Sequence, residues 1–130
     1  MGFVAVLAAA AASWVFGAIW YMVLSKPWVA ASGVEVDENG RPKDQSPLPF
    51  ILSAIAMIVV AGMMRHIFAM AEITEMGKAI LSGLGIGAFF ISPWTMINNA
   101  YGGRPFTLTI IDGGYAIIGC GLMGAVLTLL

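Results

Sequence analysis

Residues 3–24 read FVAVLAAAAASWVFGAIWYMVL and contain no acidic or basic side chain. A helix of about 20 apolar residues is long enough to cross the hydrocarbon core of a bilayer. Further apolar stretches of similar length follow at residues 48–70, 79–100 and 106–130. The chain is therefore predicted to be an all-α integral membrane bundle of four transmembrane helices, forming a single transmembrane domain over residues 1–130.

The overall composition leads to the same class of protein. Apolar residues make up 60% of the chain and charged residues 10%, whereas soluble domains carry roughly 25% charged residues. Backbone groups inside lipid must be hydrogen-bonded within their own segment, and long apolar segments achieve this as helices. We expect membrane lipid to cover most of the surface and no soluble catalytic domain to be present. The net charge of −1 gives no sign of a nucleic acid partner.

The positions of Lys and Arg predict how the chain crosses the membrane. With four spans, the polar loop at residues 25–47 and the turn at residues 101–105 lie on one side, and they contain Lys26, Arg41, Lys43 and Arg104. The other side has Lys78, and Arg65 lies a few residues inside the second span. Because cytoplasmic loops are enriched in Lys and Arg, we expect the loop and the turn in the cytoplasm and both termini on the outer side of the membrane.

Small residues recur at every fourth position along the spans. In a membrane, such a stripe lets two helix backbones approach closely. The predicted helix-packing positions are Ala5, Ala9, Ser13 and Gly17 in the first span, Gly83 and Gly87 in the third, and Ala116, Cys120 and Gly124 in the fourth, while the second span offers Ala54 and Gly62 with Ile58 between them. These stripes serve packing within the bundle or contact with a second copy or another protein.

Polar residues inside the spans are the candidates for chemistry, because a charge at the centre of a transmembrane helix costs about 2.5–3.5 kcal/mol. Asp112 lies roughly 10 Å along the fourth span from Pro105, at 1.5 Å per residue. One polar cluster is predicted in the cytoplasmic half, made of Tyr21, Asn98, Asn99, Arg104, Asp112 and Tyr115. Arg65 and His66 form a second polar cap near the opposite end.

Asp112 has two interpretations. It is either a structural anchor tied to Arg104, Asn98 or water, or a proton carrier. The middle levels of the spans contain no ionisable group beyond the thiol of Cys120, and the first span has no charge at all. Small four-helix multidrug transporters depend on an acidic residue in the first helix, so the sequence favours the anchor.

Several classes of site find no support in the sequence. There is no nucleophile elbow, no glycine-rich phosphate loop after a strand and no HExxH motif. The chain has one Cys and one His, so we expect no intrachain disulfide and no metal site. We therefore predict no enzyme activity, no catalytic residue and no cofactor. A further expectation is that Pro93, which follows Ser92, kinks the third helix.

Short motifs along the chain resemble a known family. They are Gly17-Ala18-Ile19-Trp20-Tyr21, Lys26-Pro27-Trp28, Gly33, Asn98-Asn99, Arg104, Ile111-Asp112-Gly113-Gly114-Tyr115 and Met123-Gly124. In their order and spacing they resemble the bacterial four-helix membrane family called domain of unknown function seventeen sixty-one. The resemblance implies a four-helix fold in a bacterial inner membrane and implies no activity. The polar insert at residues 33–47 departs from the pattern.

Two functions fit these observations. The first is a non-catalytic structural or accessory component of the inner membrane, which packs as a homo-oligomer or within a larger membrane complex. The small-residue stripes and the uncharged middle of the spans favour it. The second is a small transporter or channel that uses Asp112 together with Asn98 and Asn99.

Cysteine labelling tests the predicted topology. We expect a cysteine introduced at Ser46 to be protected from an impermeant reagent added on the periplasmic side, and a cysteine near Leu130 to react. The physical basis is the excess of cations on the side of the loop. Labelling at position 46 from the periplasm would reverse the assignment.

Overall fold

The computed structural model describes residues 2–38 and 47–130, and within them it forms helices and no strand. The helices are α1 (Gly2–Val23), α2 (Ser25–Ser32), α3 (Leu48–Met70), α4 (Met76–Ile86), the π-helical turn η1 (Gly87–Ile91), α5 (Ser92–Tyr101) and α6 (Phe106–Leu129). Four helical segments are long and apolar enough to span a membrane, with α4, η1 and α5 forming one of them, Met76–Tyr101. The predicted all-α fold with four spans is confirmed.

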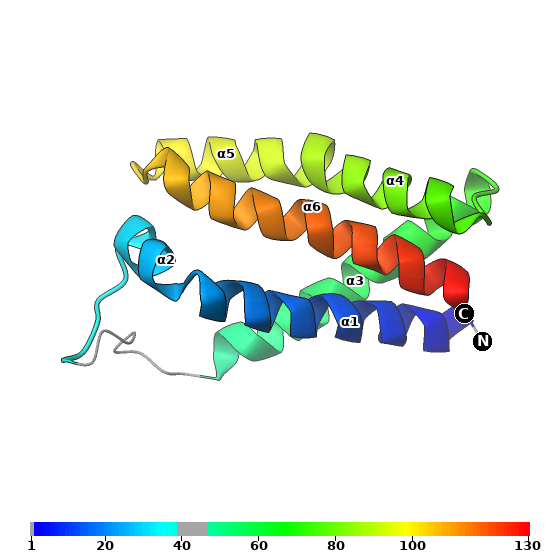
Figure 1. The fold of residues 1–130 in the computed structure, drawn as a ribbon, viewed down its shortest axis with the longest axis horizontal. Coiled ribbons are helices and arrows are strands. Elements are labelled where there is room, and N and C mark those ends of the chain that lie inside the picture. Colours follow the sequence, from blue (N-terminus) through cyan, green and yellow to red (C-terminus); the bar gives the residue numbers. More distant parts are fainter. Residues whose placement is uncertain (1, 39–46) are drawn as a thin grey trace.

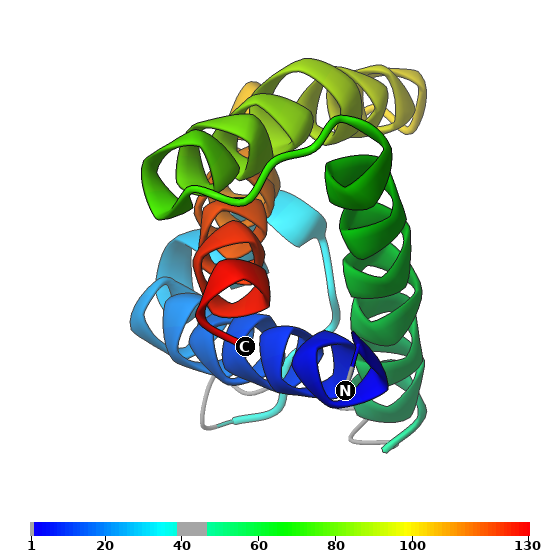
Figure 2. The same ribbon diagram turned by 90° about the vertical axis from the view of Figure 1, so that its right-hand side faces the viewer.

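Helix α6 occupies the centre of the bundle. It packs against α1 on one side and against α4, η1 and α5 on the other, as the ribbon shows (Figure 1). Helix α3 packs mainly against α1 and touches α6 only slightly. Seen along the bundle, α3 stands apart from α4 and α5 (Figure 2). The bundle therefore has three closely packed spans and one peripheral span.

The two ends of the bundle carry different segments. Helix α2 and the turn between α5 and α6 lie at one end, and the N- and C-termini lie at the other (Figure 1). This places Lys26 and Arg104 at the same end, as the sequence predicted. Arg41 and Lys43 fall outside the described residues. Which end faces the cytoplasm stays a prediction.

The first part of the predicted polar loop is a helix. Residues 25–47 were expected to be loop, but Ser25–Ser32 forms α2. Pro27 is compatible with helix here because its missing N–H falls in the first turn. Gly33 ends the helix with a φ of 73°, a left-handed conformation that glycine adopts without steric cost. Residues 39–46 of the predicted loop lie outside the described part of the chain.

The third span is interrupted by a π-helical turn at Gly87–Ile91. Pro93 has no N–H to donate, and its ring clashes with the carbonyl four residues earlier. The chain compensates one residue before the proline, where the Ser92 N–H bonds to the Gly87 carbonyl five residues back. The expected distortion at Pro93 thus takes the form of a widened turn, and the span remains helical through it.

Glycines bring the third span into backbone contact with α6. A Cβ added to Gly83 would overlap the carbonyl oxygen of Cys120, and one added to Gly87 would overlap that of Ala116. Both obstacles are backbone atoms, which cannot rotate away. The structure thereby places the small residues of the third and fourth spans against each other.

The stripe of α1 is buried along its whole length, at Ala5, Ala9, Ser13 and Gly17. Helix α3 covers the expected small-residue positions only in part. Its buried residues are Ala61, Met64 and Phe68, while Ala54 and Gly62 are half-buried and Ile58 is exposed. Met64 and Phe68 add larger side chains to the contact, because both belong to the buried cluster that also contains residues of α1 and α6.

Alanine substitutions in the third span test the glycine contact. We expect Gly83→Ala and Gly87→Ala each to destabilise the bundle by at least about 1–3 kcal/mol, because the added methyl meets the backbone of α6. Gly85→Ala is a matched control, since the nearest atom to its added Cβ is on Phe89 at 4.0 Å. Thermal unfolding in detergent measures the three variants. Equal stability of Gly85→Ala and Gly87→Ala would contradict the contact.

Candidate functional site

Asp112 is held by a hydrogen bond from another span. The hydroxyl of Tyr21 donates to Oδ1 of Asp112 at 2.7 Å. The antiparallel course of α1 and α6 brings these residues to one level, since Tyr21 is near the end of α1 and Asp112 is near the start of α6. Both residues are half-buried. Hydrogen bonds to a carboxylate are about twice as strong as neutral ones.

Tyr115 continues the polar contacts towards the middle of the bundle. Its hydroxyl lies 3.2 Å from two acceptors, the carbonyl oxygen of Ser13 and the sulfur of Met57. The Ser13 hydroxyl donates in turn to the carbonyl of Gly119 at 2.7 Å. Polar groups therefore follow the α1–α6 contact from Asp112 to mid-span. Beyond this level the core is apolar, with Met64 and Met123 among its fully buried side chains.

Aromatic rings pack around Tyr21, the hydrogen-bond partner of Asp112. The ring of Tyr21 meets Tyr115 at 5.5 Å between centroids and Trp28 of α2 at 6.3 Å, with planes 75° and 82° apart. The indole of Trp20 donates to the carbonyl of Ile111 at 2.9 Å. We call Asp112, Tyr21, Trp28 and Tyr115 the aromatic–carboxylate cluster. It joins three helices at one end of the bundle.

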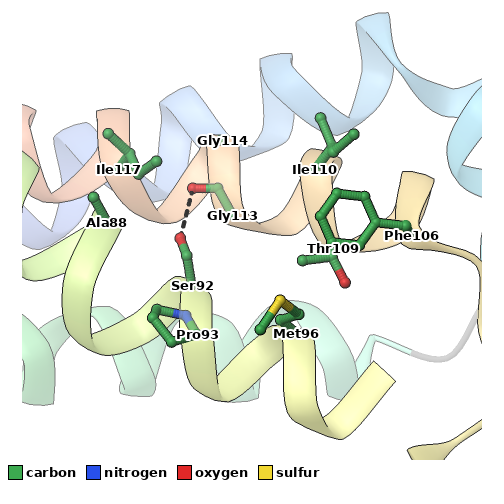
Figure 3. Close-up of a pocket in the computed structure, with 10 residues that line it drawn as sticks. All are labelled: Ala88, Ser92, Pro93, Met96, Phe106, Thr109, Ile110, Gly113, Gly114 and Ile117. Atoms are coloured by element: carbon green, nitrogen blue, oxygen red, sulfur yellow. Dashed lines mark hydrogen bonds between the residues drawn. The ribbon is translucent and has the colours of Figure 1, made fainter. Parts of the chain in front are cut away.

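An apolar groove of about 450 Å³ lies between α6 on one side and η1 and α5 on the other. Its lining consists of Ala88, Ser92, Pro93, Met96, Phe106, Thr109, Ile110, Gly113, Gly114 and Ile117 (Figure 3). The Ser92 hydroxyl crosses the groove and donates to the Gly113 carbonyl at 3.3 Å. Gly113 makes room for this serine, because a Cβ there would lie 3.0 Å from its hydroxyl oxygen. The groove offers packing space without a charged group.

The structure divides the predicted polar cluster. It brings Tyr21, Asp112 and Tyr115 together but leaves Asn98 and Arg104 exposed. Asn99 is buried and donates to the hydroxyl of Thr109 at 3.3 Å rather than to Asp112.

The expected ties of Asp112 to Arg104 or Asn98 are replaced by the bond from Tyr21. Arg104 belongs to the turn before α6, about two helical turns from Asp112. Asn98 is exposed while its neighbour Asn99 turns inward to α6. Closeness in sequence therefore did not predict the partner of Asp112, which came from the antiparallel helix α1.

Arg65 and His66 are exposed at the opposite end, as placed by the sequence. The Arg65 side chain lies against Gly2 at the start of α1. Over residues 2–38 and 47–130, no group of three or more His, Cys, Asp or Glu side chains could hold a metal ion.

Two tryptophan contacts were missed by reasoning from sequence. Trp14 donates to the hydroxyl of Ser53 at 3.0 Å and joins α1 to α3, and Trp20 joins α1 to α6. The available signal was the presence of an N–H donor within an apolar span, since a buried indole normally finds an acceptor. The sequence did not say which helix would supply that acceptor.

Comparison with protein families shows which family the chain belongs to. The model of a family described as Protein of unknown function (DUF1761) matches residues 4–128. The chain belongs to this family. The DUF1761 match covers all four spans and includes the aromatic–carboxylate cluster. Neither curated proteins nor solved structures give a match to this chain. The four apolar helices make this DUF1761 member a multi-pass membrane protein.

Substitutions at both ends of the Tyr21–Asp112 bond test its contribution. We expect Asp112→Asn to cost less stability than Asp112→Leu, because the amide oxygen still accepts from Tyr21 whereas leucine leaves that hydroxyl unpaired. The leucine penalty should be about 1–3 kcal/mol. Thermal unfolding of the purified variants provides the comparison.

A double-mutant cycle supplies the control. Tyr21→Phe should destabilise the native chain but add little in the Asp112→Leu background, because the bond is already lost. Tyr101→Phe, at a ring that is 91% exposed, should leave stability unchanged. Fully additive effects of Tyr21→Phe and Asp112→Leu would show that the two side chains do not interact.

Proposed function

We propose that this DUF1761 protein is a non-catalytic structural or accessory component of the inner membrane, with periplasmic termini, that packs with a second copy or within a larger membrane complex. The observation that carries the proposal is the one-sided packing of α3. Its buried residues, Ala61, Met64 and Phe68, form one narrow face towards the bundle.

The remainder of α3 is broad and apolar. Large exposed side chains follow its outer face, namely Ile51, Leu52, Ile55, Val59 and Met63. Association of helices in lipid is driven by packing and by interhelical hydrogen bonds rather than by the hydrophobic effect. A span with only one substantial neighbour has the most packing to gain from a helix outside the chain. The proposed partner surface is therefore the outer face of α3.

The same proposal holds that the spans have no catalytic role. Among the described residues, Asp112 is the only carboxylate inside a span, and its hydrogen-bond partner is a phenol. General acid–base catalysis needs a positioned group within reach of a substrate proton. The half of the bundle near the termini has an apolar core around Met64, Phe68 and Met123. These features support a packing role for the spans.

Site-specific cross-linking tests the α3 surface. In a Cys120→Ala background, a single cysteine replaces Ile55 or Val59 on α3. The control is a cysteine in place of Ile110 on α6, where the native side chain is 61% exposed, against 65% for Val59. We expect thiol-specific cross-linking in native membranes to give adducts from α3 and none from position 110. Their mass distinguishes a second copy from another protein. A single-chain mass at every position, together with a monomer in lipid nanodiscs, would overturn the proposal.

A small transporter or channel is the second candidate, and one observation favours it. The polar contacts from Asp112 through Tyr115 to Ser13 reach the middle of the α1–α6 contact. Asn98 and Asn99 take no part, because the first is exposed and the second is bonded to Thr109. This function predicts pH-driven flux in liposomes that disappears in Asp112→Asn while the fold is retained. Such a result would replace the accessory role.

A further inference from the structure

Among the residues that the structure describes, no cationic side chain pairs with Asp112. Its one contact among the described residues is the hydrogen bond from the neutral phenol of Tyr21. Lys26 and Arg104, the cations at this end of the described structure, are both exposed and form no ion pair with it. An ionisable group within a membrane span is costly and normally faces a partner or a polar pathway. Beside its bond from Tyr21, the carboxylate therefore has capacity for a cation.

The hydrogen-bond partner of this carboxylate lies among aromatic rings. Tyr21, Trp28 and Tyr115 come from three different helices, and Tyr21 meets each of the other two rings edge to face. Ring faces carry negative potential and attract ammonium groups, and cages of such rings recognise alkylated ammonium ions. The rings and the carboxylate thus favour the same sign of charge.

The chemistry of the cluster selects an organic cation over a metal ion. Calcium and magnesium need about six oxygen ligands, and one carboxylate beside aromatic carbon does not supply them. An alkylated ammonium group has a diffuse charge and apolar methyl or methylene groups. It can contact ring faces and a carboxylate together, at a level roughly 10 Å from the end of α6, counting 1.5 Å per residue from Pro105.

Helix α2 forms the outer wall of the cluster. It is eight residues long and buries only Ala31, so it is held to the bundle by a small contact. Trp28 approaches Tyr21 from this helix. Because α2 buries so little, a movement of α2 that admits a ligand beside Tyr21 and Asp112 would cost little buried contact.

We propose that Asp112, with the rings of Tyr21, Trp28 and Tyr115, forms a binding site for an organic cation that carries an alkylated ammonium group. This site is independent of the α3 surface, so either can fail without the other. The cation is a soluble compound or the headgroup of a lipid such as phosphatidylcholine.

Binding of choline to the purified full chain tests the site. Choline is compared with 3,3-dimethylbutan-1-ol, in which carbon replaces the quaternary nitrogen and shape is kept. In phosphatidylglycerol nanodiscs, calorimetry and tryptophan fluorescence should show saturable binding of choline and at least tenfold weaker binding of the neutral alcohol. Potassium chloride at equal ionic strength should not compete. Equal binding of the two compounds, or no saturable choline binding, would overturn the proposal.

Variants assign the binding to the cluster. Asp112→Asn should weaken choline binding at least tenfold, and Trp28→Leu should weaken it more than Trp28→Phe, which keeps a ring. Trp94→Leu is the control for loss of an exposed indole, since Trp94 is 66% exposed on α5. If Asp112→Asn does not fold, the comparison of Trp28→Leu with Trp28→Phe still tests the site, because α2 contributes little to the core and both variants should fold. Unchanged affinity in folded Asp112→Asn, or equal affinity in the Phe and Leu variants, would reject the site.

The source of the cation is settled by the lipid. If the headgroup of phosphatidylcholine occupies the site, nanodiscs of that lipid should weaken choline binding relative to phosphatidylglycerol, and Asp112→Asn should remove the difference. If the ligand is a soluble compound, choline affinity should be the same in both lipids. A difference between lipids that persists in Asp112→Asn would place any headgroup effect elsewhere and reject the lipid form of the proposal.

Discussion

The backbone contact between the third span and α6 organises the bundle. Gly83 and Gly87 lie against carbonyl oxygens of α6, and Gly124 lies against the carbonyl of Ala79 in the same way. In lipid the hydrophobic effect does not drive helices together, so close backbone approach supplies much of the packing energy. The contact fixes α6 at the centre, and α1 then packs on its other side. The remaining features of the molecule follow from this central position.

Helix α6 also carries most of the polar contacts between spans. Within the described residues, no buried side-chain nitrogen or oxygen lacks a hydrogen-bond partner. Ser13, Trp20 and Ser92 each donate to a backbone carbonyl of α6. These bonds tie polar side chains of neighbouring spans to one helix, where an unsatisfied group would be expensive. The aromatic–carboxylate cluster is the one place where the acceptor on α6 is an ionisable side chain.

The peripheral elements are held by fewer interactions. Helix α3 is joined to α1 by its narrow buried face and by the bond from Trp14 to Ser53, and α2 is joined through Ala31 and Trp28. Local stability within a protein follows the amount of buried contact. The surfaces to which we assign binding, the outer face of α3 and the wall formed by α2, are therefore the parts of the molecule most able to adapt to a partner.

The sequence by itself determined the number of spans, the all-α class and the packing role of glycine at positions 83 and 87, because span length and residue size are local properties. It did not determine which helices are neighbours. Tyr21 replaced Arg104 and Asn98 as the partner of Asp112, α3 buried Met64 and Phe68 together with Ala61, and Ser25–Ser32 became a helix beside the cluster. Those outcomes depend on the antiparallel pairing of α1 with α6 and on the distance of α3 from α4, which periodicity within a single helix does not encode.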